Sequence, residues 1–558
     1  MRETQDGGKK KYLIAFIVIW VVQMAAAFYF CTQKQGFHED EYYTYYSTSR
    51  TNGFYVEDGA WMDREDYLNE FVVLPNERFR YGLVRLVQSW DVHPPMYYWV
   101  FHTVASLVPN VFSKWIGLSV NLFFHGINII LLTHLSCLVV GRESRLSLFM
   151  TLFWGLSPAV MGGVVFIRMY EMLTTCVLVC AILHVRAVRK NEAKLSVLKC
   201  LVPMAAVTYV GFLTQYYYFI FLFYLAIAFC VWLLWRDKNI WNCLRYGISQ
   251  TAAFVLAYLT YPSCLGQMFH GQRGAQATAN FFDLSNTLER IGFFYDLMDR
   301  CLFGHLLSVL LLLILILAVT DYMWKKRVMK GMTRHTEKVV CERYRAEFDA
   351  CFWMLMFVSV GYFLTVSKTA LLLGDTSNRY QLPVYGIAVL LVFDAISVLW
   401  RRVSAVCAEN GISAKCVKYM KYTEAAAVLI CFIALLLGYW TDGVEFLYPE
   451  DKEQVAFAGE CAAQGTPAVY LYQPGEEWCI WDVADELFMY PEVYFVAVDS
   501  EDRLDDAEIQ NADSLVVYIA GSADDTEQTM RMAGSANLKS GYCTRMFDEK
   551  YCDVWYFE

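Results

Sequence analysis

The chain has 558 residues, of which 57% are hydrophobic and only 18% are charged. A soluble domain is nearer a quarter charged, so this composition excludes an ordinary soluble protein and indicates many membrane spans. Charge is divided along the chain: the tail after Trp440 holds 26 acidic and six basic residues, about −20 net, and the rest carries about +10. No basic patch lies on a polar domain, which argues against nucleic-acid binding.

The first apolar run covers residues 12–31 and follows three lysines at 9–11. About 20 apolar residues suffice to cross the ~30 Å hydrocarbon core of a bilayer. Three alanines at 25–27 resemble a signal-peptidase site, but the apolar run continues past them. This favours an uncleaved membrane anchor.

A polar segment, residues 32–95, follows the anchor and concentrates the ionisable side chains beside the membrane. Asp40 and Glu41 open a tyrosine-rich stretch that ends at Arg50 and fits an amphipathic helix at the membrane interface. The carboxylate pair has two interpretations: a general base with a hydrogen-bonding neighbour, or an acidic cap at a helix N-terminus.

The segment closes with Asp91 and His93, followed by Pro94 and Pro95. Two prolines stiffen the backbone and start a helix well, so they would present both side chains in a fixed geometry. The alternative is a plain turn before a helix. The apolar run 96–108 that follows is about 13 residues long, which suits a re-entrant or interfacial helix better than a span.

Ten further apolar runs are long enough to cross, which makes eleven spans in total: residues 113–140, 147–167, 170–187, 195–213, 216–235, 246–264, 301–322, 350–373, 381–400 and 423–440. If 96–108 does not cross, the N-terminus shares one side with five basic connections, at residues 141–145, 186–194, 236–245, 325–345 and 401–421. Basic connections face the cytoplasm. We therefore predict a multi-pass plasma-membrane protein with a cytoplasmic N-terminus and an extracytoplasmic tail.

This topology gathers five polar features at the outer face: the first loop and residues 168–171, 214–218, 265–300 and 377–380. Among them, Arg168 and Arg379 suit a phosphate clamp, because a guanidinium group binds phosphate through two parallel hydrogen bonds. The alternative for each is snorkelling to lipid phosphates. The three tyrosines at 216–218 are typical of an aromatic belt.

The acidic tail, residues 441–558, alternates strand and helix patterns, which predicts a small α/β domain. We expect strands near 468–472, 493–498 and 514–520, helices near 482–489 and 505–511, and a final hairpin. Its four cysteines are compatible with disulfides or with free thiols: Cys461, Cys479, Cys543 and Cys552.

Four motifs occur in one order: an acidic pair after the first span, Asp-x-His-Pro-Pro-x-Tyr-Tyr from Asp91, Arg-Met-Tyr from Arg168, and Arg-Tyr-x-x-Pro from Arg379. In this order they resemble the membrane glycosyltransferases of the GT-C fold. The most similar group contains the dolichyl-phosphate-mannose protein mannosyltransferases and the bacterial aminoarabinose transferases. The resemblance covers roughly residues 10–400 and leaves the tail outside.

The resemblance implies a mainly α polytopic bundle, residues 1–440, with residues 32–95 as its catalytic loop and residues 441–558 as a separate domain. It implies transfer of a hexosyl or pentosyl group, with inversion, from a polyprenyl-phosphate donor to an extracytoplasmic glycan, lipid or protein. The site residues carried over are Asp40 as base, Glu41 for positioning, Arg168 and Arg379 on the phosphate, Tyr170 and Tyr380 as supports, and His93 in the pocket wall.

Two points stay open within this interpretation. Glu39 is a third adjacent carboxylate, so the base is not assigned by sequence alone. Some GT-C enzymes use a divalent metal and others do not, and the candidate ligands here would be His38, Asp40, Glu41, Asp91 and His93. No other cofactor is indicated.

Two functions of other classes compete with the enzyme. A lipid transporter or flippase would be expected to show charges near the bilayer midplane, broken helices or internal repeats, and the spans here contain few charges. A membrane-anchored binding or assembly protein would act through its acidic tail.

Overall fold

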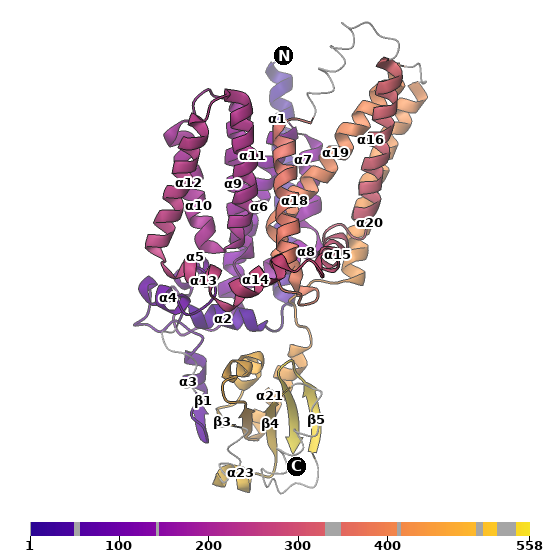
Figure 1. The fold of residues 1–558 in the computed structure, drawn as a ribbon. Coiled ribbons are helices and arrows are strands. Elements are labelled where there is room, and N and C mark those ends of the chain that lie inside the picture. Colours follow the sequence, from indigo (N-terminus) through magenta and orange to yellow (C-terminus); the bar gives the residue numbers. More distant parts are fainter. Residues whose placement is uncertain are drawn as a thin grey trace.

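The structure is a computed structural model that describes residues 2–49, 56–140, 144–329, 348–409, 414–497, 506–521 and 543–557. Several predicted features therefore lie partly or wholly outside the described residues, among them Arg50 and much of the basic connections at 141–145 and 325–345. The described chain forms a long helical bundle with a small mixed domain at one end (Figure 1).

Eight helices in the described ranges are long and apolar enough to cross a membrane, so the chain is a multi-pass membrane protein. They are α1 (Arg2–Gln33), α6 (Lys114–Val140), α9 (Tyr170–Lys190), α10 (Val202–Thr214) with the π turn before it, α11 (Tyr217–Asp237), α16 (Leu307–Met329), α18 (Ala350–Thr369) and α19 (Leu382–Glu409).

A ninth span is formed if α7 (Arg145–Gly155) and α8 (Pro158–Val165) count as one bent unit, with 57° between them. The break has a local cause, since Ser157 caps α8 and Pro158 occupies its first turn. Helices α12 (Trp241–Thr260) and α20 (Ala414–Thr441) correspond to the two remaining predicted spans. Helix α12 is less apolar than the eight helices above, and α20 is apolar over a shorter stretch. The predicted count of eleven is therefore not confirmed.

The short apolar run after Pro95 forms α5 (Met96–Ala105), which is too short to cross. Figure 1 shows α5 at the end of the bundle that faces the tail, opposite the N-terminus. The same end holds α2 (Glu39–Ser47), α4 (Tyr81–Gln88), α8, α13 (Ser263–Phe269), α14 (Gln272–Phe282) and α15 (Thr287–Leu297). The polar features predicted to share one face thus do lie at one end of the molecule.

The tail forms a six-stranded sheet in the order β1-β3-β2-β4-β6-β5. Its own strands are β2 (Ala468–Tyr472), β3 (Glu492–Ala497), β4 (Leu515–Ala520), β5 (Cys543–Asp548) and β6 (Cys552–Phe557). Strand β2 is parallel to β3 and β4, and β5 and β6 form the expected hairpin. The tail helices are α21 (Asp451–Gln464), α22 (Ala484–Leu487) and α23 (Ala507–Asn511).

The edge strand β1 (Ala60–Asp63) comes from the first loop, together with α3 (Arg64–Asn69), and pairs antiparallel with β3. Residues 32–95 and 441–558 therefore share one sheet, although β1 and β3 lie more than 400 residues apart in sequence. All four tail cysteines are free thiols.

Helix α2 forms where the tyrosine pattern predicted it, but its expected place at the membrane interface is wrong. Tyr42 and Tyr45 are fully buried in protein. Tyr43 and Tyr46 pack on Trp481 of the tail, with ring centroids 4.5 and 4.7 Å apart. The tail covers this helix, so its aromatic rings contact protein and not lipid.

Candidate active site

The first turn of α2 is built by a reciprocal cap. The backbone N–H of Asp40 donates to Nδ1 of His38 at 3.0 Å, and the backbone N–H of His38 donates to Oε2 of Glu41 at 2.7 Å. Burial lowers the pKa of His38 to about 4, so the ring is neutral near pH 7 and Nδ1 can accept. The capping box orders three consecutive carboxylates at the start of one helix.

Those three carboxylates have different surroundings. Glu41 is fully buried, pairs with Nζ of Lys34 at 2.9 Å, and accepts the backbone N–H of Ile167 at 2.7 Å. Glu39 points to the tail, where Lys550 lies 2.6 Å away. Asp40 alone of the three lines a cavity. Glu41 therefore ties α2 to the end of α1 and to the turn before α9, and stays a residue proposed for positioning.

Asp40 lies between two arginines. Its Oδ2 is 3.1 Å from Nη1 of Arg379, and its Oδ1 is 3.8 Å from Nη2 of Arg168. Burial acts to raise the pKa of Asp40, but the two guanidinium groups outweigh it and hold that pKa well below the usual range. The carboxylate is consequently ionised and forms ion pairs with both arginines.

Arg168 lies in the break between α8 and α9 and is 3% exposed. Its Nη1 donates to the backbone oxygen of Asp40 (2.9 Å), to Oγ1 of Thr44 (3.2 Å) and to the hydroxyl of Tyr98 (3.0 Å). One nitrogen thus holds α2 and α5 in place. The other, Nη2, faces the carboxylate of Asp40 and the ring of His93.

Arg379 belongs to the short 3-10 turn Thr376–Tyr380 between α18 and α19, and it is also 3% exposed. Its guanidinium group lies 5.1 Å from the ring of Phe166 and 5.2 Å from that of Tyr380. Neither Nε nor Nη1 completes a hydrogen bond with the described residues, so Nη1 reaches Asp40 only as an ion pair. This arginine has donor capacity to spare.

His93 and Asp91 form a second pair at the edge of the cavity, with Nδ1 of His93 3.1 Å from Oδ2 of Asp91. Burial acts to raise the pKa of Asp91, but the neighbouring imidazole outweighs burial and lowers that pKa. Helix α5 begins directly after the two prolines, which fits both the fixed presentation and the plain turn that the sequence left open.

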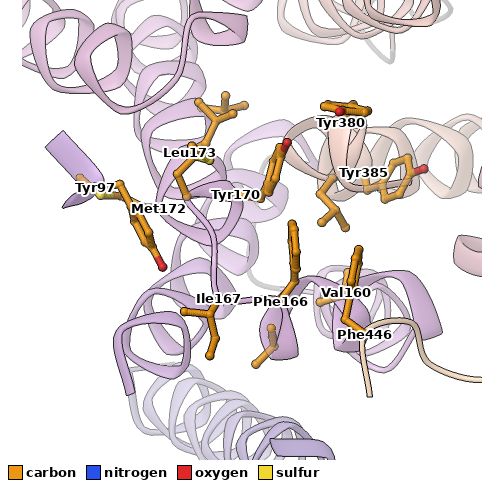
Figure 2. Packing of buried hydrophobic residues seen from close by; sticks show 14 of the residues in the cluster. Tyr97, Val160, Phe166, Ile167, Tyr170, Met172, Leu173, Tyr380, Tyr385 and Phe446 are labelled. Carbon is orange, nitrogen blue, oxygen red and sulfur yellow. The ribbon is translucent and has the colours of Figure 1, made fainter. Parts of the chain in front are cut away.

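Aromatic rings wall the site on the other side. Figure 2 shows Phe166, Tyr170 and Tyr380 gathered in one cluster, with Phe446 beside Phe166. The rings of Phe166 and Phe446 stack with centroids 4.0 Å apart, and Tyr170 meets Tyr380 edge to face at 6.1 Å. These rings keep water away from Asp40 and the two arginines. Charges attract one another more strongly where water is excluded.

One cavity of about 240 Å³ joins these groups. Six of the seven predicted site residues line it, Glu41 being the exception: Asp40, His93, Arg168, Tyr170, Arg379 and Tyr380. Tyr216 and Tyr217 also face it, so for them the aromatic-belt interpretation is wrong, while Tyr218 is buried in the bundle.

Sequence reasoning missed four polar residues of the cavity wall, namely Gln267, Arg273, Gln276 and Thr369. The side chain of Gln267 donates to the backbone oxygen of Gln88, which ties α13 to the first loop. Arg273 and Gln276 are three residues apart and share one face of α14. The available signal for the first three was their place in the segment 265–300, which was predicted to share the outer face.

The candidate metal ligands do not converge. Within the described ranges, no group of three or more His, Cys, Asp or Glu side chains is arranged to hold a metal ion. Asp40 instead faces two cations.

A second, apolar cavity of about 390 Å³ lies between α11 and α12. Phe219 borders both cavities, so the apolar groove lies next to the polar site. Leu222, Ala226, Tyr246 and Gly247 are among the residues that line the groove.

Two solved structures resemble this one over nearly the whole chain: ArnT from Cupriavidus metallidurans bound to undecaprenyl phosphate, and the same protein in the apo state. Each is 12% identical with a TM-score of 0.51, and the match covers 99% of this chain and 98% of the ArnT chain. The fold is accordingly of the GT-C type seen in ArnT. The expectation that the likeness ends near residue 400 was wrong, because the tail lies within it. Neither a protein-family model nor a curated protein matches the sequence.

Proposed function

We propose that this protein is a membrane glycosyltransferase that moves a sugar from a polyprenyl-phosphate donor to an acceptor, with inversion at the anomeric carbon. The observation that carries the proposal is a carboxylate and two buried arginines in one cavity, with an apolar groove next to it that shares Phe219. A lipid phosphate has the same two parts, an anionic head and an apolar chain.

The mechanism follows from the chemistry of these groups. Arg379 and Nη2 of Arg168 bind the phosphate, and the prenyl chain lies in the groove between α11 and α12. Asp40 takes the proton of the acceptor hydroxyl, whose oxygen attacks the anomeric carbon as the bond from that carbon to the phosphate oxygen breaks. The arginines stabilise the charge that develops on the departing polyprenyl phosphate.

The side of the membrane is part of the proposal. The N-terminal end of α1 lies at the end of the bundle opposite the cavity, and the alternation of basic connections along the chain supports a cytoplasmic location for that end and a reaction outside the cytoplasm. The fold likeness supports the donor class, since ArnT was solved with undecaprenyl phosphate bound. The acceptor is an extracytoplasmic glycan, lipid or protein.

The test compares cell-envelope glycans by mass spectrometry in cells that carry the wild-type protein, the Asp40→Asn variant, or none. Asparagine keeps the size of aspartate but cannot take a proton, and general-base catalysis is worth about 10² to 10⁴ in rate. We expect a sugar modification that is present with wild type and nearly absent in the other two. Envelope glycans that are identical in all three would contradict the proposal, and altered transbilayer distribution of an unchanged lipid would point to a flippase.

A further inference from the structure

Asp40 lies where the phosphate of the proposed donor has to bind. Its two carboxylate oxygens face Arg168 and Arg379, and both arginines are almost entirely buried, whereas the Asp40 side chain is 28% exposed. A carboxylate and a phosphate are alternative anionic partners for the same guanidinium groups.

One nitrogen of each arginine faces the carboxylate of Asp40. Nη1 of Arg168 is occupied by Thr44, Tyr98 and the backbone of α2, so Nη2 is the nitrogen that faces Asp40. Arg379 is confined by the rings of Phe166 and Tyr380, and its Nη1 is the atom that contacts Asp40. A phosphate that binds both arginines through these nitrogens therefore competes with Asp40.

We propose that Asp40 is an internal competitor for the donor phosphate, so that donor binding displaces its carboxylate from Arg379 and frees it to act as the base. The inference deepens the proposed function and rests on it. Asp40 thereby has two successive partners, an arginine before the donor binds and the acceptor hydroxyl afterwards.

The charged groups around Asp40 explain why donor binding would change its proton affinity. Four ionisable groups surround the carboxylate: His38 from its own helix cap, His93 from the first loop, and the two arginines. A positive charge within about 4–6 Å favours an ionised carboxylate and makes it a poor proton acceptor. When a phosphate neutralises the arginines, the proton affinity of Asp40 rises. Donor binding thus makes Asp40 a better proton acceptor. The donor therefore has to bind before the acceptor hydroxyl is deprotonated.

The experiment measures binding of undecaprenyl phosphate to the purified full-length protein in lipid nanodiscs. Asp40→Asn should bind it about tenfold more tightly than wild type, because the phosphate then no longer competes with a carboxylate for the two guanidinium groups. Glu39→Gln is the matched control: it removes the same charge one residue away, but Glu39 pairs with Lys550 and should leave affinity nearly unchanged. In an Arg379→Ala background, Asp40→Asn should gain little.

Unchanged or weaker binding by Asp40→Asn would overturn the inference, as would an equal gain from Glu39→Gln, which would signal only general electrostatics. If Asp40→Asn does not purify, a structure of the wild type with undecaprenyl phosphate decides the matter. The distance from Asp40 Oδ2 to Arg379 Nη1, now 3.1 Å, should exceed 4 Å, and an intact pair would refute the exchange. Failure of wild type to bind the lipid phosphate at all would instead count against the proposed function.

Discussion

Asp40 and Glu41 are adjacent in sequence, but in the first turn of α2 their side chains point in different directions. Asp40 faces the cavity, whereas Glu41 points into the protein and meets Lys34. Consecutive positions on a helix do not share a face, so one carboxylate can react while the next supports the structure. At this scale the cap interpretation of the acidic pair applies to Glu41, whose carboxylate accepts the backbone N–H of His38, and the base interpretation stays a proposal for Asp40.

This difference predicts that Glu41→Gln acts on stability. Both partners of the Lys34–Glu41 pair are completely buried, and removing one partner of a buried pair costs about 3–5 kcal/mol because the other charge is left unpaired. We expect the purified variant to unfold several degrees below wild type. Glu39→Gln, whose carboxylate is on the surface of the tail contact, should unfold with wild type. A Glu41→Gln protein of unchanged stability that has lost transfer would show that Glu41 acts in the chemistry instead.

At the scale of elements, helices α11 and α12 leave an apolar groove between them that lies next to the polar cavity. Gly247 lines this groove on α12, and a Cβ atom added there would meet no other atom within 4 Å. A larger side chain at this position therefore starts from open space and extends into the groove.

We predict that Gly247→Phe blocks the prenyl chain and weakens binding of undecaprenyl phosphate by tenfold or more. A phenyl ring buries as much surface as several methylene groups of a lipid chain, each worth about 0.8 kcal/mol. The control is Gly292→Phe on α15, another helical glycine with open space around it, which should bind like wild type. A short-chain prenyl phosphate should tolerate Gly247→Phe better than undecaprenyl phosphate. Equal binding by all three proteins would exclude the groove as the lipid site.

At the scale of the whole molecule, the tail and the first loop act as one unit. Strand β1 completes the tail sheet, Trp481 covers α2, and Asp451 packs against Gly36 in the turn before α2. Several carboxylates gather in this contact. Burial first, and neighbouring carboxylates second, raise the pKa of Asp451 to about 8, of Asp482 to about 7 and of Glu549 to about 8.

These pKa values predict that the contact between the tail and the first loop weakens as pH rises. A carboxyl group whose pKa is higher folded than unfolded binds more protons when folded, so its stabilisation is complete below about pH 4 and is lost as pH passes about 7 to 8. We expect hydrogen exchange in α21 and α22, corrected for intrinsic rates, to be faster at about pH 8.5 than at about pH 5. Asp451→Asn should reduce that difference. Slower exchange at the higher pH would contradict the prediction.

The sequence by itself determined the helical membrane class, the polar first loop, the α/β character of the tail and six of the residues that line the cavity. These are local properties: apolar length, strand periodicity, proline position and the placing of arginines at the ends of apolar runs. Six cavity residues could be named because each lies at such a boundary. The side chains of Gln267 and Arg273 were missed because no comparable boundary marks their positions in the sequence.

Tertiary structure alone decided which side chains meet. Asp40, Arg168 and Arg379 come from three segments spread over some 340 residues, and only packing brings them within 4 Å. The same holds for β1, whose four residues become a strand because β3 offers it an unpaired edge. Backbone hydrogen bonds across a sheet and ion pairs across a bundle depend on distance in space, and a pattern of neighbours along the chain does not record that distance.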